Sequence, residues 1–265
     1  MLTGKYAVVL SRNARGSAAM ETAKAMAAAL GVDYLDRPHN QVLEDFMAEQ
    51  GLAAVIVLEK EGPRIHSAYG TFAYHPGMAE IRVQQLLRGA SDHLVKALAL
   101  HPGARVLDCT LGLASDAAVA ACVAGPGGKV VGLEASLLLH FAVKHGLAHY
   151  ECKTPLLTAA LRRVEAVHAE AADYLAQCVQ KGTSFDVVYF DPMFRHPVQG
   201  SKAMEALRPL SLEAPLDKAT VALALQVAPR VVIKERSEYL LEQYGCSEYV
   251  GGKYSRIKFG IIRRA

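Results

Sequence analysis

The sequence predicts an α/β protein with a mainly parallel sheet that ends in an antiparallel pair, preceded by a small N-terminal α/β unit. From Arg105 onward, apolar segments alternate with helical segments, which is typical of a parallel sheet covered by helices on both faces. The last two strand segments, 247–250 and 255–263, are joined by Gly251-Gly252. So short a link permits only antiparallel pairing. A length of 265 residues allows one large α/β domain, or a small domain joined to a medium one.

Composition narrows the class of protein. Hydrophobic residues make up 52% and charged residues 21%, which supports a normal core and argues against intrinsic disorder. We expect neither a signal peptide nor a membrane span, because the chain has no apolar h-region and no apolar run near 18 residues. The five cysteines form no C-x-x-C pair, so we expect a reduced, cytoplasmic protein without a zinc ribbon. A net charge of +3 does not by itself indicate a nucleic-acid partner.

Residues 1–78 form the predicted small unit. It is expected to contain a buried strand, an Ala-rich helix, a second strand, and one or two further strands, at 6–10, 17–30, 52–59 and 65–74 respectively. The tripeptide His75-Pro76-Gly77 breaks this pattern, and we place the domain boundary just after it.

Residues 79–265 form the predicted main domain, which opens with a mostly helical segment broken at Gly89. Parallel strands are expected at 105–110, 129–134, 164–169, 185–191 and 230–234. Helices are expected at 116–124, 137–146, 174–181, 218–227 and 238–244. In such sheets, ligands bind beyond the carboxyl ends of the strands, at the topological switch point. This rule directs attention to the loops that follow Thr110, Leu133 and Phe190.

The first of these loops follows an acidic strand end. Asp108 closes the strand, and a turn of small residues around Gly112 leads into a helix that Ser115 or Asp116 can cap. Small residues let the backbone approach a ligand closely. A single glycine does not make the dinucleotide fingerprint, and the acid at the strand end suits a ligand with cationic groups better than a pyrophosphate. An ordinary β–α turn is the alternative.

The second loop places Glu134 directly after an apolar strand. A carboxylate at this position can accept two hydrogen bonds from a ribose diol. The spacing from Asp108 is near the ~20 residues expected in a nucleoside-binding βαβ unit. A solvated strand-end glutamate is the alternative.

The third loop reads Asp191-Pro192-Met193-Phe194 at the end of an apolar strand. The Asp191 carboxylate and the Pro192 carbonyl are two acceptors, and Phe194 offers a flat face on which a planar base can stack, worth roughly 1–3 kcal/mol. An acceptor pair beside a stacking ring suits a planar exocyclic amine. The alternative is a plain Asp-Pro turn with a core phenylalanine.

These loops, in this order, resemble a class I S-adenosylmethionine-dependent methyltransferase. Asp191 to Phe194 is similar to the (Asp/Asn)-Pro-Pro-(Tyr/Phe) motif of amine methylases, with Met193 in place of the second proline. More closely, 108–116, 187–196 and 231–234 resemble the small-subunit ribosomal RNA guanine-N2 methyltransferases. The resemblance covers about Val106 to the C-terminus and implies a Rossmann-like fold.

The resemblance also implies a cofactor, a reaction and a set of site residues. S-adenosyl-L-methionine would be bound by Asp108, Gly112, Ser115, Asp116, Glu134, Ala135, Glu170, Ala171 and Asp191. Methyl transfer to an exocyclic base amine, guanine N2 of ribosomal RNA, would depend on Asp191, Pro192 and Phe194. No metal is expected. A protein or small-molecule amine acceptor and a non-catalytic cofactor-binding module remain alternatives.

Candidate substrate contacts lie outside these loops. His196 follows the Asp-Pro loop, and Lys234 ends a predicted strand. Tyr254, Arg256 and Lys258 would share one face of the last strand as a basic, aromatic stripe. A solvated edge strand whose charges prevent aggregation is the equal alternative. We expect the N-terminal unit to contribute to substrate binding.

Overall fold

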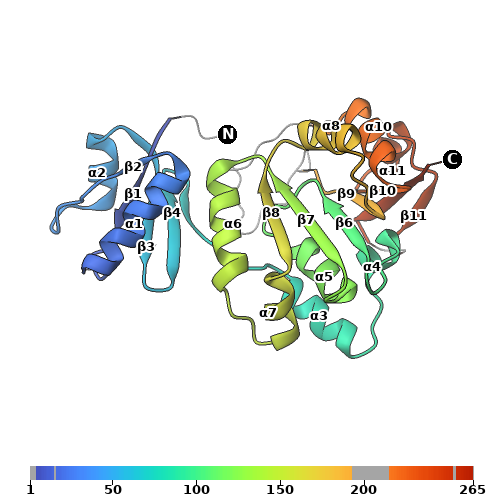
Figure 1. Cartoon of the computed structure of the whole chain (residues 1–265), viewed down its shortest axis with the longest axis horizontal. Helices are drawn as coiled ribbons and strands as arrows, with labels where there is room; N and C mark the ends of the chain where they lie inside the picture. Colours follow the sequence, from blue (N-terminus) through green and yellow to red (C-terminus); the bar gives the residue numbers. More distant parts are fainter. Residues whose placement is uncertain (1–3, 15, 193–214, 253–254, 265) are drawn as a thin grey trace. The chain divides into compact units, whose positions relative to one another are not determined.

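The computed structural model describes residues 4–14, 16–192, 215–252 and 255–264, which form two compact units (Figure 1). Of these described residues, the first unit contains 4–75 and 136–146. The second contains 76–135, 147–192 and everything described from 215 onward.

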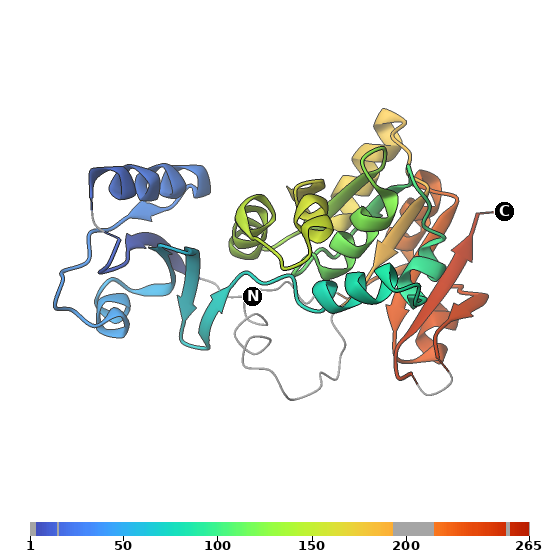
Figure 2. The same cartoon turned by 90° about the horizontal axis from the view of Figure 1, so that it is seen from below.

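The sheet of the first unit has the strand order β2-β1-β3-β4-β5. Its strands are β1 (Lys5–Leu10), β2 (Asp33–Tyr34), β3 (Leu52–Glu59), β4 (Gly62–Ser67) and β5 (Gly70–Ala73). The first three strands run parallel, whereas β4 and β5 add an antiparallel hairpin. Helices α1 (Ser17–Leu30) and α2 (Leu43–Glu49) lie on opposite faces of this sheet (Figure 2). The predicted strands and the Ala-rich helix are confirmed, while β2 and α2 were not predicted.

The second unit is built on a seven-stranded sheet with the order β11-β12-β10-β9-β6-β7-β8. Its strands are β6 (Arg105–Asp108), β7 (Lys129–Glu134), β8 (Val164–His168), β9 (Val187–Phe190), β10 (Arg230–Glu235), β11 (Glu248–Val250) and β12 (Lys258–Arg263). Strands β6 to β10 pair in parallel. Strand β12 runs antiparallel to both β10 and β11, which confirms the predicted antiparallel end.

Helices cover both faces of this sheet, as predicted (Figure 1). They are α3 (Ala79–Leu87), α4 (His93–Leu98), α5 (Ser115–Ala124), α7 (Pro155–Leu161), α8 (Ala171–Lys181), α10 (Lys218–Val227) and α11 (Glu238–Gln243). A further helix, α6 (Leu137–His149), belongs mostly to the first unit. On one face, Leu175 of α8 and Val221 of α10 pack over the buried side chains of the central strands. The break predicted at Gly89 separates α3 from α4, whereas α7 was not predicted.

The strand order creates a switch point between β6 and β9. From β6 the chain proceeds to β7 and β8 on one side of the sheet, and then to β9 and β10 on the other. The two central strands are apolar and buried, with Asp108 aligned beside Tyr189. Parallel strands buried on both faces need such continuous apolar runs. The carboxyl ends of β6, β7, β9 and β10 therefore bring polar residues from distant parts of the sequence to one edge.

Gly132 in β7 is required for this edge to pack. A Cβ atom at this position would lie 2.2 Å from Cδ1 of Leu111, whose side chain is buried. We expect Gly132→Ala to lower the free energy of unfolding by about 1–3 kcal/mol, because an overpacked core must shift. Urea denaturation would measure this, with Gly127→Ala as the control, since nothing lies near a Cβ there. Equal stability of the two variants would contradict the packing argument.

Candidate functional site

The loop after β6 is a tight turn that lies against the end of β7. The Leu111 amide donates to the Leu133 carbonyl at 2.8 Å, and the Gly112 amide donates to Oε2 of Glu134 at 3.2 Å. Gly112 and Ala114 both have left-handed backbone conformations, with φ values of 49° and 57°. This conformation is uncommon for alanine. The turn thus brings small residues and a carboxylate from the neighbouring strand into one place.

Glu134 is only 8% exposed at the end of β7. One of its oxygens is tied to the turn, so the carboxylate is held at the strand edge. The carbonyl of the next residue, Ala135, lies 3.0 Å from Nε2 of His168. The structure therefore places Glu134 at the carboxyl end of its strand, and its role as a ligand to a ribose diol stays a prediction.

Asp108 is 1% exposed, and burial raises the pKa of its carboxyl to about 7, with the nearby Asp116 and Asp191 carboxylates adding to the increase. The Thr110 amide donates to Oδ1 of Asp108 at 3.0 Å, and the Thr110 hydroxyl donates to the same oxygen at 3.3 Å. Oγ1 of Thr110 in turn accepts the Asp191 amide at 2.6 Å. Thr110 thereby connects the loop after β6 to the loop after β9.

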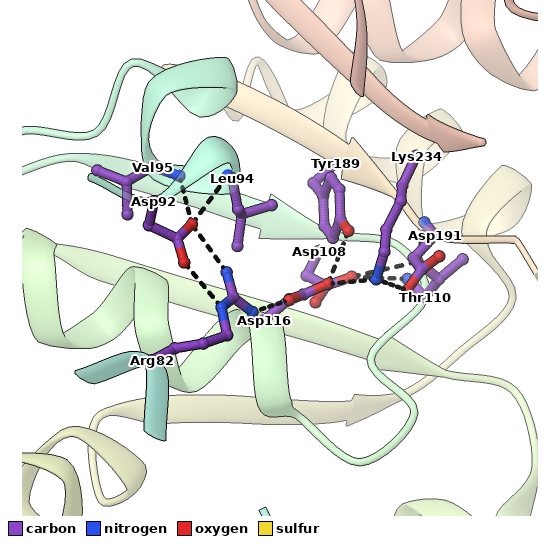
Figure 3. A network of polar contacts seen from close by, with 10 residues as sticks. All are labelled: Arg82, Asp92, Leu94, Val95, Asp108, Thr110, Asp116, Tyr189, Asp191 and Lys234. Carbon is purple, nitrogen blue, oxygen red and sulfur yellow. Dashed lines mark hydrogen bonds and ion pairs between the residues drawn. The ribbon is translucent and has the colours of Figure 1, made fainter. Parts of the chain in front are cut away.

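Asp191 follows β9 directly, with its side chain 27% exposed. Its Oδ2 accepts a hydrogen bond from Nζ of Lys234 at 2.7 Å (Figure 3). Burial raises the pKa of the Asp191 carboxyl to about 6, and Asp116 and Glu235 add to this increase while Lys234 opposes it. At neutral pH the group is therefore an anionic acceptor, held at the switch point of the sheet.

Behind Asp191 lies an ion-pair chain in which carboxylates and cations alternate: Asp191, Lys234, Asp116, Arg82 and Asp92 (Figure 3). Nζ of Lys234 is 3.2 Å from Oδ2 of Asp116, and Arg82 donates to the other oxygen of Asp116. Arg82 makes two further bonds, of 2.8 and 2.9 Å, to Asp92.

Two more contacts anchor this chain. The Tyr189 hydroxyl donates to Oδ2 of Asp116 at 2.7 Å. Asp92 caps α4 by accepting the Leu94 and Val95 amides. The middle of the chain and its Asp92 end are thus fixed to secondary structure of the second unit.

The structure brings together several of the residues predicted to bind the cofactor. Asp108, Gly112, Glu134 and Asp191 meet at the carboxyl edge of the sheet. Asp116 differs, because its two oxygens accept from Arg82, Tyr189 and Lys234. A cofactor contact by Asp116 would therefore come from its backbone. The remaining predicted cofactor residues begin helices or strand-end loops: Ser115 at α5, Ala135 after β7, and Glu170 with Ala171 at α8.

The predicted substrate residues divide into three groups. Phe194, His196 and Tyr254 lie outside the described residues. Lys234 lies in the ion-pair chain. The predicted stripe on the last strand is wrong for Arg256, because β12 begins only at Lys258 and Arg256 lies in the exposed bend before it. Nζ of Lys258 lies 3.3 Å from the Gly252 carbonyl and 3.7 Å from Glu238.

Sequence reasoning missed Thr110, Asp92 and Tyr189, as well as the ion pairs of Arg82. Thr110 and Tyr189 stand inside or beside apolar strand segments, where their side chains give no separate signal. Arg82 is 34 residues from Asp116, so no local spacing could have paired them. Only the loop positions relative to the strand ends could be inferred beforehand.

The site residues fit an adenosyl cofactor with a charged amino-acid part. Glu134 offers carboxylate oxygens for a diol, the turn at Gly112 admits close backbone approach, and Asp108 is a buried acid suited to a cationic group. Within the described ranges, no three His, Cys, Asp or Glu side chains form a group that could hold a metal ion, and no helix is long and apolar enough to cross a membrane.

Comparisons with known proteins identify the family of this chain. A family model described as "Putative SAM-dependent methyltransferase" matches residues 56–258. The uncharacterized protein YpiP of Bacillus subtilis is 33% identical over 249 residues, covering 92% of this chain and 94% of its own length. The ribosomal RNA small subunit methyltransferase J of Aliivibrio fischeri is 30% identical over 161 residues, which cover 57% of this chain and 61% of that enzyme.

A solved structure shows the same fold. The SAM-dependent methyltransferase NGO1261 from Neisseria gonorrhoeae superposes with a TM-score of 0.66 at 18% identity, covering 97% of this chain and 95% of that one. With the family model matched over most of its length, the chain belongs to the class I S-adenosylmethionine-dependent methyltransferases.

Proposed function

We propose that this methyltransferase methylates an exocyclic base amine of RNA, namely guanine N2 in small-subunit ribosomal RNA. The observation that carries the proposal is the Asp191 carboxylate, which lies at the switch point beside Pro192 and already accepts an N–H donor at 2.7 Å. The name of the Aliivibrio relative, a ribosomal RNA small subunit methyltransferase, supports RNA as the acceptor class.

Three residues would hold the cofactor. Glu134 would accept from the ribose hydroxyls, Gly112 would allow close backbone approach, and Asp108 would face the cationic amino-acid part. When bound, S-adenosylmethionine supplies a methyl group on a sulfonium, and transfer replaces the C–S bond by a C–N bond while the electron pair stays on sulfur. The chain's own residues then have to position the amine.

Asp191 and the Pro192 carbonyl would accept the two N–H groups of the amine. A guanine amine is a poor nucleophile, because its lone pair is delocalised into the ring. Hydrogen bonds to Asp191 and Pro192 would localise that pair on nitrogen and stabilise the positive charge that develops there. The amine proton can leave to solvent after transfer, so no strong general base is required.

Further substrate contacts are part of the same proposal. Phe194 would stack on the base and hold it for attack, and His196, Arg256 and Lys258 would contact the RNA. A base within a duplex would first have to be flipped out, whereas a loop base is already accessible. The contribution of the N-terminal unit to substrate binding stays a prediction.

The test is methyl transfer from labelled S-adenosylmethionine into ribosomal subunits and separated RNA from cells lacking the gene. Wild type and Asp191→Ala are compared, with cofactor binding of both measured by calorimetry. Label in small-subunit RNA with wild type only, mapped to guanine N2, is the expected result. Label in protein or small-molecule fractions instead would replace RNA by another amine acceptor.

Glu134→Ala is expected to weaken S-adenosylmethionine binding at least about tenfold, because charge-assisted hydrogen bonds are worth about 1.5–3 kcal/mol. The variant also removes the acceptor of the Gly112 amide. Calorimetry measures the dissociation constant, and Glu165→Ala, an exposed carboxylate on β8, is the control. An unchanged constant for Glu134→Ala would remove this residue from the cofactor site.

A further inference from the structure

The ammonium group of Lys234 pairs with two carboxylates, and the side chain is largely shielded from solvent. Its Nζ lies 2.7 Å from Oδ2 of Asp191 and 3.2 Å from Oδ2 of Asp116. The side chain is 18% exposed, against 13% for Asp116 and 27% for Asp191. These two carboxylates raise the pKa of the ammonium, which therefore stays charged despite its burial.

The position of the ammonium is fixed by Asp116, which is itself held by other residues. Both oxygens of Asp116 accept hydrogen bonds, one from Arg82 and the other from the Tyr189 hydroxyl as well as from Lys234 (Figure 3). Arg82 is held in turn by two bonds to Asp92. A direct contact between Lys234 and an RNA phosphate would have to break its pairs with two partly buried carboxylates, which is costly.

Only one oxygen of Asp191 is used in this arrangement. Lys234 donates to Oδ2, and no described residue donates to Oδ1. The Asp191 amide is fixed separately by Thr110. Backbone and carboxylate are therefore both anchored, and the described part of the chain leaves Oδ1 as an acceptor.

We propose that Lys234 is a positioning residue for methyl transfer: its ammonium orients the Asp191 carboxylate and keeps it ionised, so that Oδ1 receives the substrate amine. The inference rests on the proposed role of Asp191. It gives Lys234 a role that acts through Asp191, in place of the RNA contact expected from the sequence.

The charges around Asp191 determine in which direction its pKa changes when Lys234 is replaced. Asp116 from α5, Glu235 from β10, Asp108 from β6 and the Tyr189 hydroxyl from β9 face this region. Among the described residues, Lys234 is the one cation in direct contact with Asp191. A cation at such a distance lowers a carboxyl pKa by about 1–3 units. Without it, burial and the neighbouring carboxylates would favour the protonated acid, which cannot accept through both oxygens.

The experiment titrates Asp191 directly in the full chain labelled with ¹³C at aspartate carboxyl groups. Its resonance is assigned as the one lost in Asp191→Asn. We expect Lys234→Met to raise the pKa of Asp191 by at least about one unit, and Lys234→Arg to leave it near the wild-type value. Lys129→Met, at an exposed lysine paired with Glu165, is the matched control and should not move the signal.

A second variant distinguishes a specific charge effect from a general loss of structure. Asp116→Asn removes a like charge next to Asp191 and leaves Lys234 to pair with Asp191 alone, so it should lower the pKa of Asp191. Shifts of opposite sign in Lys234→Met and Asp116→Asn cannot come from general loosening of the site. Unchanged titration in Lys234→Met, or shifts of the same sign in both variants, would overturn the proposal.

Kinetics separates this inference from the proposed function. With the acceptor that wild type methylates, Lys234→Met should move the acidic limb of kcat to higher pH by the shift seen in the titration. A higher KM for RNA with kcat and its pH profile unchanged would make Lys234 a substrate contact instead. If the acceptor is not RNA, the proposed substrate fails, whereas the titration still decides the role of Lys234.

Discussion

Replacing Asp191 is expected to reduce kcat by about 10²–10³, the loss typical of removing one preorganised group from a transition-state site. Asp191→Ala removes both the acceptor and its charge, whereas Asp191→Asn keeps an acceptor oxygen and loses the charge. The alanine variant should therefore be the slower of the two. Single-turnover methyl transfer at saturating cofactor measures the effect without product release.

The pH profile makes this prediction specific to the carboxylate. With the pKa of Asp191 raised to about 6, wild-type kcat should rise between pH 5 and pH 7 as the group ionises. Asp191→Asn has no group at this position that ionises between pH 5 and pH 7, so its kcat should not show this rise, the acidic limb of the profile. Asp173→Asn, at an exposed aspartate in the first turn of α8, is the control and should keep both rate and limb.

Two outcomes would contradict the role assigned to Asp191. If Asp191→Ala retained full methyl transfer, the amine would be positioned by other groups. If its loss of activity were matched by an equal loss of cofactor affinity, Asp191 would act on the cofactor instead of the acceptor. Calorimetry on the same protein preparations distinguishes these cases.

Which residues of this site the sequence predicts depends on whether their position follows from the order of the strands. Asp108, Glu134 and Asp191 were found because the first two end a strand and the third directly follows one, and the strand order of a doubly wound sheet brings strand ends together. The antiparallel end of the sheet was predictable for a similar reason, since a short glycine link fixes the direction of the next strand.

The ion-pair chain was not predictable in this way. Lys234 is 118 residues from Asp116 and 43 from Asp191, and its partners depend on side-chain directions across three elements. A buried lysine at a strand end looks in sequence like any solvated strand-end lysine. Some short elements were not predicted, for another reason. The seven-residue helix α7 has too few turns to show helical periodicity in the sequence.

Asp108→Asn is expected to stabilise the cofactor-free protein at pH 8. Burial raises the pKa of Asp108 to about 7, well above the 3.8 of an exposed aspartate, so folding favours the protonated acid. Its contribution to the free energy of unfolding is then full below about pH 4 and is lost as the pH rises through 7. Above pH 7 the buried charge costs roughly 4 kcal/mol, because the pKa differs by about three units and each unit is worth about 1.4 kcal/mol.

Asparagine removes that cost because it has no charge, and its side-chain oxygen can still accept the Thr110 amide. Urea denaturation at pH 4.5 and pH 8 should show a stability gain that is larger at pH 8, with Asp173→Asn as the control. The same variant should bind S-adenosylmethionine at least about tenfold more weakly, since it loses a charged partner. A gain independent of pH would mean that Asp108 is not ionised at pH 8. A gain at pH 8 together with weaker cofactor binding would show why a destabilising acid is kept at the end of the central strand: its charge is needed by the ligand and not by the fold.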